Sequence, residues 1–273
     1  MNAAAGVAPD GFGVRLRAAI AERGRLCIGI DPHPPLLEAW GLTDDAVGAA
    51  RFGLLCAEAF ASEVSVVKPQ VAFYEQYGAA GIDALEEVIA ACRSRGALVI
   101  ADAKRGDIGS TMTGYARAWL GDGPLGADAV TLSPYLGYGA LAPAIDAARA
   151  AGRGVFVLAR TSNPEGKQVQ EGGVAQAIVD DARADNADGT ATVGLVVGAT
   201  RGHGLDLGSL GGPVLAPGLG AQGATAEDLP RIFGGVELLL PSTSRDVLRE
   251  GPALPALRAA ARRERDAVER ALA

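Results

Sequence analysis

Asp102, Lys104 and Asp107 lie close together in the chain, directly after an apolar run at residues 97–101. The run is bounded by Gly96 and by this charged cluster, a pattern typical of a buried strand. Because alternate residues of a strand point to the same face, we expect Asp102 and Lys104 to leave the end of the strand side by side. A lysine between two carboxylates is a charged proton donor held beside negative charge. The cluster is therefore the first place to look for function.

Short apolar runs separated by segments of helix length predict an α/β fold, a (β/α)₈ barrel of parallel strands. The predicted strands are residues 26–30, 64–67, 97–101, 129–132, 154–159, 193–197, 214–216 and 236–240. The predicted helices between them are residues 44–61, 81–95, 111–120, 141–150, 174–186 and 225–233. A doubly wound open sheet is the alternative, but no GxGxxG motif follows the first predicted strand.

Segments outside this alternation complete the predicted barrel. Residues 12–23 are expected to form a capping helix over its bottom, and residues 254–272 a closing helix with Arg and Glu on its solvated face. Residues 202–212 are rich in Gly and too short for a full helix, so the sixth helix is the weakest part of the pattern. Because barrels often fill a chain of 273 residues, we expect a single domain over residues 1–273.

Composition and charge narrow the class of protein. The chain has 25 Lys and Arg against 32 Asp and Glu, a net charge of −7, and its basic residues are dispersed, which argues against nucleic-acid binding. The cysteines lack metal-binding spacing and fit reduced thiols, which favours a soluble cytoplasmic protein. The absence of a secretory leader and of a membrane-length apolar run argues against a membrane partner. His33 and His203 form no metal site by themselves and are expected to have structural or solvent-exposed roles.

Polar groups recur where the predicted strands end, and in a barrel of this kind that face carries the chemistry. Asp31 follows the first strand, Lys68 the second, and Asp102 with Lys104 the third. Loops are polar in any protein, so one such residue alone means little. Two lysines and several carboxylates on neighbouring strands are harder to dismiss, and they predict a site at this end of the barrel.

The loops after the seventh and eighth strands predict a phosphate site. Many barrels bind phosphate there with backbone N–H groups and a side-chain donor. Residues 217–223 offer glycines for close approach of the backbone and the amide of Gln222. Arg245 offers a guanidinium that can bind phosphate through two hydrogen bonds. Both features at the expected pair of strands favour a phosphorylated substrate.

These motifs together resemble a known family. DAKRGDIGST, residues 102–111, resembles the Asp-x-Lys-x-x-Asp-Ile-x-x-Thr signature of orotidine 5'-phosphate decarboxylases. PGLGAQG, residues 217–223, is similar to the phosphate-gripping loop of that family, and Arg245 matches its following arginine. KPQVAFYEQYG, SPYLGYGAL and LARTSNPEG resemble the longer bacterial, type 2 subgroup. The resemblance runs over residues 31–245.

The resemblance implies that the protein decarboxylates orotidine 5'-monophosphate to UMP and CO₂, the last step of UMP biosynthesis. It implies no metal, flavin or pyridoxal cofactor. Lys104 would then protonate C6 of the pyrimidine, and Asp102 would face the departing carboxylate. Lys68 and Asp107 would complete an alternating array of charges that keeps Lys104 protonated.

The resemblance also implies the substrate-binding residues and a homodimer. In this family the equivalent of Asp107 enters from the neighbouring subunit, which implies shared active sites. Asp31, Lys68 and Thr111 would contact the ribose, and Ser162 the pyrimidine, with Asn163 as its neighbouring alternative. The implied phosphate-binding residues are Pro217, Gln222 and Arg245.

Two other readings are open at this stage. A sister enzyme on the same barrel, a sugar-phosphate decarboxylase or formaldehyde-fixing aldolase, shares the Asp-x-Lys-x-x-Asp core. Such enzymes need Mg²⁺ ligands and lack the continuation to Ile108 and Thr111, and no added acidic residue stands beside Lys68. A non-catalytic phosphate-binding barrel is the second reading. Such a protein would be expected to have lost one of the four residues of the alternating charged array, and all four are present.

Overall fold

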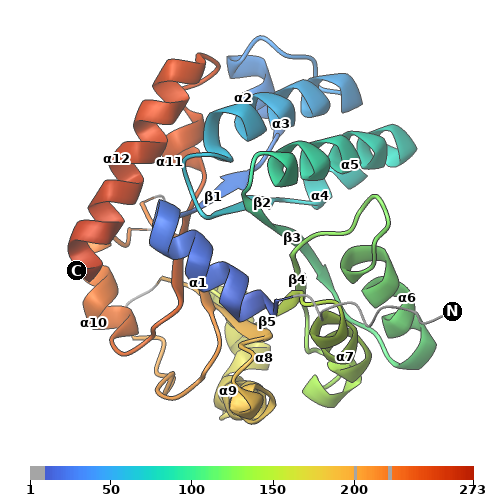
Figure 1. Ribbon diagram of the computed structural model, residues 1–273, viewed down its shortest axis with the longest axis vertical. Coiled ribbons are helices and arrows are strands. Elements are labelled where there is room, and N and C mark those ends of the chain that lie inside the picture. Colours follow the sequence, from blue (N-terminus) through green and yellow to red (C-terminus); the bar gives the residue numbers. More distant parts are fainter. Residues whose placement is uncertain (1–9, 200–201, 221–222) are drawn as a thin grey trace, which may run out of the picture.

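The computed structural model describes residues 10–199, 202–220 and 223–273. Its strands are parallel and pair in the order β1 to β8, with β8 returning to β1, so that the sheet closes into a barrel (Figure 1). The strands are β1 Cys27–Ile30, β2 Val66–Pro69, β3 Leu98–Arg105, β4 Ala129–Leu132, β5 Gly154–Arg160, β6 Val193–Val197, β7 Val214–Pro217 and β8 Leu239–Thr243. This confirms the predicted (β/α)₈ barrel.

Helices alternate with the strands and form the outer layer of the barrel (Figure 1). They are α2 Pro34–Ala39, α3 Ala46–Phe60, α4 Ala72–Glu75, α5 Gly78–Ser94, α6 Gly109–Leu120, α7 Ala142–Ala150, α8 Lys167–Gln170, α9 Val174–Asp185, α10 Leu229–Phe233, α11 Arg245–Leu248 and α12 Leu254–Leu272. As the Gly-rich sequence suggested, the described residues between β6 and β7 contain no helix. Within the described ranges, no helix is both long and apolar enough to span a membrane.

A capping helix precedes the first strand, as predicted. This helix, α1 Phe12–Arg23, lies across one end of the barrel (Figure 1). Phe12 is fully buried, with its ring edge-on to Phe156 at a centroid distance of 6.0 Å. Gly154 leaves the space for it, because a Cβ at that position would come within 2.5 Å of the Phe12 ring. The N-terminal end of the barrel is thereby closed, which leaves the opposite end for a site.

The alternation of side chains along each strand divides the apolar residues between two cores. On β3, Val99 and Ala101 pack outward against the helices, whereas Leu98 and Ile100 point into the barrel below α1. The residues of the inner core are Phe12, Leu16, Ala19, Cys27, Val66, Leu98, Ile100, Ala129, Phe156, Val196, Leu215 and Leu240. Continuing the same alternation upward from Ile100 places polar side chains on the inside of the barrel mouth.

The eighth strand differs from its predicted bounds. The apolar run at residues 236–240 suggested the strand, but β8 is shifted toward the C-terminus and includes Pro241, Ser242 and Thr243. Pairing sets these bounds, since Ser242 stands opposite both Cys27 of β1 and Pro217 of β7. A buried polar pair at a strand end is invisible to a search for apolar runs. Here it brings hydroxyl groups to the barrel mouth.

Candidate active site

A cavity of about 580 Å³ opens at the C-terminal ends of the strands. All eight strands or the loops that follow them contribute to its lining. Its polar lining residues are Asp31, His33, Lys68, Gln70, Asp102, Lys104, Thr131, Thr161, Ser162, Asn163, Ser242, Thr243, Ser244 and Arg245. A closed barrel places its side chains for chemistry at this face.

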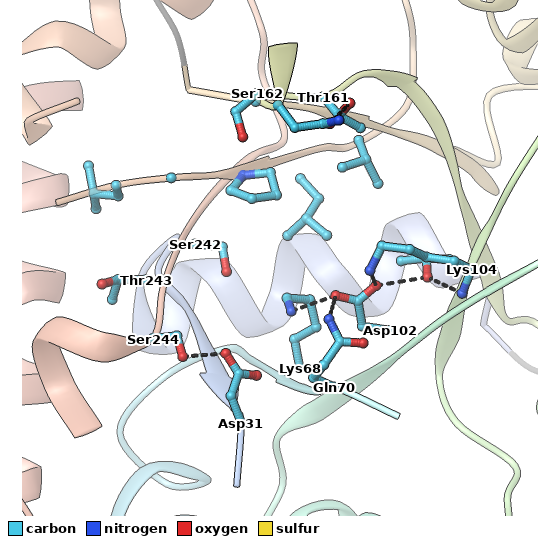
Figure 2. A pocket seen from close by; sticks show the side chains of 18 of the residues that line it. Asp31, Lys68, Gln70, Asp102, Lys104, Thr161, Ser162, Ser242, Thr243 and Ser244 are labelled. Atoms are coloured by element: carbon cyan, nitrogen blue, oxygen red, sulfur yellow. Dashed lines mark hydrogen bonds and ion pairs between the residues drawn. The ribbon is translucent and has the colours of Figure 1, made fainter. Parts of the chain in front are cut away.

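Asp102 is the centre of the polar network (Figure 2). Its Oδ1 accepts a hydrogen bond of 2.6 Å from Lys104 Nζ, and its Oδ2 accepts one of 2.8 Å from Lys68 Nζ. Gln70 Nε2 donates to Oδ2 at 3.0 Å, and Thr131 Oγ1 donates to Oδ1 at 3.0 Å. Four donors from three neighbouring strands or strand ends therefore fix one carboxylate.

The charges in this network stabilise one another. Burial disfavours the ionised form of Asp102, but the positive charges of Lys68 and Lys104 outweigh it and hold the pKa of this carboxyl well below its usual range. Burial also opposes the charge on Lys68, and the carboxylates of Asp102 and Asp31 reverse that effect and raise the pKa of Lys68. Both groups are consequently charged at neutral pH.

Lys104 differs from its neighbours in exposure. Its side chain is 46% exposed, whereas those of Lys68 and Asp102 are each 9% exposed. The ammonium of Lys104 therefore reaches the open part of the cavity while remaining bonded to a buried carboxylate. Such a group can deliver a proton or stabilise a developing negative charge on a bound molecule.

Asp31 forms a second polar centre, across the β1–β8 seam. Ser244 Oγ donates a short hydrogen bond to its Oδ2 (Figure 2). The other oxygen, Oδ1, is buried and has no hydrogen-bond partner within the described part of the chain. An oriented carboxylate with one unused acceptor at a cavity wall is suited to bind a hydroxyl group.

The opposite wall of the cavity is apolar. Leu158, Val196 and Leu215 line it, and they come from β5, β6 and β7 on the far side of the ring from β2 and β3. A ligand in the cavity is therefore placed between a charged network and an apolar surface. Charge that develops near Lys104 is poorly screened by water in such a place, which strengthens its interaction with the lysine.

The predicted residues of the cavity rim lie at or just after the ends of three strands, β5, β7 and β8. Ser162 and Asn163 follow β5 and line the cavity, and Figure 2 shows Ser162 on the other side of the view from Asp31. Pro217 ends β7 and lines the cavity. Arg245 begins α11, lines the cavity and is exposed at its rim. Gln222 lies outside the described residues.

Asp107 and Thr111 stand apart from this group. Neither Asp107 nor Thr111 lines the cavity that the described part of the chain forms. The Asp107 carboxylate accepts a hydrogen bond from the backbone N–H of Ile108 at 2.8 Å, and Thr111 is exposed on α6. Within one chain, Asp102 and Lys104 therefore line the cavity, whereas Asp107, their neighbour in the sequence, lies outside it.

Several polar residues of the cavity were not among the predicted site residues. They are His33, Gln70, Thr131, Thr161, Ser242, Thr243 and Ser244. Gln70 and Thr131 could have been found by alternation, because each lies two residues after an inward-facing residue, Lys68 or Ala129. Ser244 directly precedes the predicted Arg245, at the end of the eighth strand.

The two histidines have different environments. His203 has a structural role, since its Nε2 is 2.8 Å from the Ile232 carbonyl oxygen and its ring stacks on Phe233. His33 lines the cavity instead, beside Phe73. Burial lowers the pKa of His33, with opposing effects of Asp31 and Arg245. In residues 10–199, 202–220 and 223–273, no three His, Cys, Asp or Glu side chains are grouped as ligands of a metal ion.

Comparison with known proteins places the chain in a family. Residues 24–241 match the model of the orotidine 5'-phosphate decarboxylase / HUMPS family. An orotidine 5'-phosphate decarboxylase of Salinispora arenicola is 55% identical over 265 residues, covering 93% of this chain and 95% of the relative. A solved structure from Streptomyces avermitilis has a TM-score of 0.94 at 48% identity, covering 100% of this chain and 99% of that one. The OMP decarboxylase of Leishmania donovani has a TM-score of 0.77 at 30% identity, covering 96% and 98%.

Proposed function

The chain belongs to the orotidine 5'-phosphate decarboxylase / HUMPS family, and from that premise we propose that it decarboxylates orotidine 5'-monophosphate to UMP and CO₂. The observation that carries the proposal is the contact of Lys104 with Asp102 at the wall of a cavity whose opposite wall is apolar. A fixed ammonium beside a fixed carboxylate suits a reaction in which a substrate carboxylate leaves and a proton takes its place.

The cavity offers a separate place for each part of this substrate. The phosphate would bind Arg245 and the loop that begins at Pro217, where glycine backbone approaches closely. A hydroxyl of the ribose would donate a hydrogen bond to the unused Oδ1 of Asp31, with Lys68 nearby. The pyrimidine would then reach Ser162 on the β5 loop.

The chemical step needs a positive charge close to C6, where negative charge develops. The C6–carboxylate bond breaks, CO₂ leaves, and the bonding electron pair stays on C6 in an orbital that no ring carbonyl can delocalise. The Lys104 ammonium stabilises this pair and gives it a proton, so that C6 gains hydrogen and the lysine becomes a neutral amine. Solvent then reprotonates the amine. Fixed charges of the protein thus stabilise the reacting carbon, and the proposal includes no metal or organic cofactor.

Asp102 contributes to the same step from the other direction. In the bound state the substrate carboxylate lies next to the Asp102 carboxylate, which is ionised because Lys68 and Lys104 flank it. The repulsion between the two carboxylates disappears when the substrate carboxylate becomes neutral CO₂. Phosphate binding at Arg245 supplies the free energy that holds the substrate in this position, far from the reacting carbon.

We propose in addition that the active unit is a homodimer in which Asp107 and Thr111 complete the partner's cavity. Both residues lie outside the cavity of their own chain. The large apolar side chains of Ile108, Tyr135 and Leu136 are 62%, 78% and 54% exposed on adjoining loops. Exposed apolar groups gathered in one region are typical of an interface.

The proposed place of action is the cytoplasm. The three buried cysteines are free thiols, which agrees with a reducing compartment.

The test is turnover of orotidine 5'-monophosphate by purified protein treated with a metal chelator. Loss of the orotate chromophore, with UMP as product, is the expected result. Turnover of a sugar phosphate that requires added Mg²⁺, with no loss of the orotate chromophore, would instead assign the chain to the other activities of its family. Binding of orotidine 5'-monophosphate without turnover would favour a non-catalytic barrel.

A further inference from the structure

One hydroxyl group joins the main chain of Lys104 to the side chain of Asp102. Thr131 Oγ1 accepts a hydrogen bond of 2.9 Å from the backbone N–H of Lys104. The same oxygen donates a hydrogen bond of 3.0 Å to Asp102 Oδ1, the atom that also accepts from Lys104 Nζ. Thr131 is 1% exposed and lines the cavity from β4.

The backbone of Lys104 needs support from outside the regular strand pairing. Its φ angle is 49°, in the left-handed region of backbone conformation that residues other than glycine rarely adopt. The register of β3 and β4 shifts at this point, because Ala101 pairs with Val130 and Arg105 with Leu132. Residues 102–104 of β3 therefore stand opposite Thr131 alone. Where regular pairing is lost in this bulge, the Thr131 hydroxyl accepts the hydrogen bond of the Lys104 N–H.

The chemistry of threonine fits this task. Its hydroxyl is one donor with two acceptor positions, so a single oxygen can accept from the N–H and donate to the carboxylate. Its branched Cβ limits the side chain to few rotamers, particularly when it is buried in a strand. The Asp102 carboxylate, which can only accept, settles the direction in which the hydroxyl proton points.

We propose that Thr131 is the positioning residue of Lys104: its hydroxyl holds the lysine backbone in the left-handed conformation from which Nζ meets both Asp102 and the substrate. This rests on the proposed function, since the reaction it affects is the decarboxylation. Thr131 itself makes no proton transfer. Without its hydroxyl, the Lys104 N–H loses its partner and the backbone of the bulge relaxes, which moves the ammonium away from its place in the cavity.

The test compares Thr131→Val, which keeps the shape of the side chain but removes the hydroxyl, with Thr131→Ser, which keeps the hydroxyl. We expect Thr131→Val to lower kcat about 10- to 100-fold with KM unchanged, since a shift of about 1 Å at a reacting group has an effect of that size. Thr131→Ser should restore most of the activity. Thr192→Val is the matched control, because Thr192 is a buried threonine at the other end of the barrel, directly before β6.

A crystal structure of Thr131→Val gives a readout that does not depend on activity. The expected result is a Lys104 φ that is no longer positive and an Nζ beyond hydrogen-bond distance of Asp102 Oδ1. Equal kcat values for wild type, Thr131→Val and Thr192→Val, or an unchanged Lys104 conformation, would overturn the proposal. Thr131→Ala, which removes the same hydroxyl without an added methyl group, replaces Thr131→Val if that variant does not fold. A wild-type protein without orotidylate turnover would overturn the proposed function instead, and the crystal structure would still test Thr131.

Discussion

Lys104 and Asp102 are two residues apart on β3, and the Nζ of the lysine lies 2.6 Å from Oδ1 of the carboxylate. The contact joins a side chain that is 46% exposed to one that is 9% exposed. Lys68 on β2, Gln70 just after β2 and Thr131 on β4 also donate to Asp102, so the carboxylate stays in place if the lysine moves. The carboxylate is thus the fixed reference of the site, and the lysine is the group presented to a substrate.

We expect Asp102→Asn to destabilise the fold strongly. The substitution keeps the shape of the side chain but leaves the buried ammonium of Lys68 without its anionic partner. Removal of one partner of a buried ion pair costs about 3–5 kcal/mol of the free energy of unfolding. Urea denaturation would measure the loss. Asp122→Asn is the control, because Asp122 pairs with Arg153 from a fully exposed position and should change the stability little. Equal effects of the two substitutions would contradict the structural role of Asp102.

The contribution of Asp102 to the free energy of unfolding should change with pH only under acidic conditions, where it decreases. Its folded pKa is depressed, so the contribution is complete above the pKa of an unfolded aspartate, about 3.9, and is lost as the pH falls below that value. We therefore expect the difference in unfolding free energy between wild type and Asp102→Asn to be constant from about pH 7 down to about pH 5 and to shrink at lower pH. A difference that stays constant below about pH 4, or that grows as the pH falls, would mean that the pKa of Asp102 is not depressed.

Arg245→Ala should weaken substrate binding at the phosphate end. A hydrogen bond to a charged group contributes about 1.5–3 kcal/mol, which corresponds to a rise in KM of about 10- to 100-fold. Steady-state kinetics with orotidine 5'-monophosphate would measure it. Arg249→Ala is the matched control, since Arg249 directly follows α11, the short helix that Arg245 begins, and pairs with Asp246 instead of lining the cavity. An unchanged KM in Arg245→Ala would place the phosphate elsewhere.

Shared active sites predict complementation between two inactive variants. We expect Lys104→Ala and Asp107→Ala each to have very low activity as homodimers. A hybrid dimer of the two contains one intact site, made of Lys104 from one chain and Asp107 from the other. Co-expression with two different affinity tags would isolate this hybrid, and its activity should approach half that of wild type. Hybrids no more active than the parent variants would show that Asp107 serves its own chain.

The sequence was sufficient to predict the barrel and the carboxylate, lysine and arginine side chains that meet in the cavity. Alternation after the run at residues 97–101 placed Asp102 and Lys104 together, and the strand ends pointed to Asp31 and Lys68. These inferences succeed because local periodicity decides which side of a strand faces inward.

Features that depend on pairing between distant strands could not be predicted in this way. The bulge that places residues 102–104 opposite Thr131 arises from the register of β3 against β4, which no local pattern reports. The bounds of β8 depend on Ser242 pairing with both β1 and β7. The exclusion of Asp107 from its own cavity likewise depends on the path of the loop after β3.

The most direct test of the account is the rate of orotidine 5'-monophosphate decarboxylation by Lys104→Ala, followed through the orotate chromophore at saturating substrate. Lys167→Ala, an exposed lysine at the start of α8, is the control for loss of a lysine. Because Lys104 is proposed both to stabilise the charge at C6 and to donate the proton, its loss should lower kcat by about 10³-fold or more, while Lys167→Ala remains at the wild-type rate. A Lys104→Ala variant that turns over substrate as fast as Lys167→Ala would contradict the account.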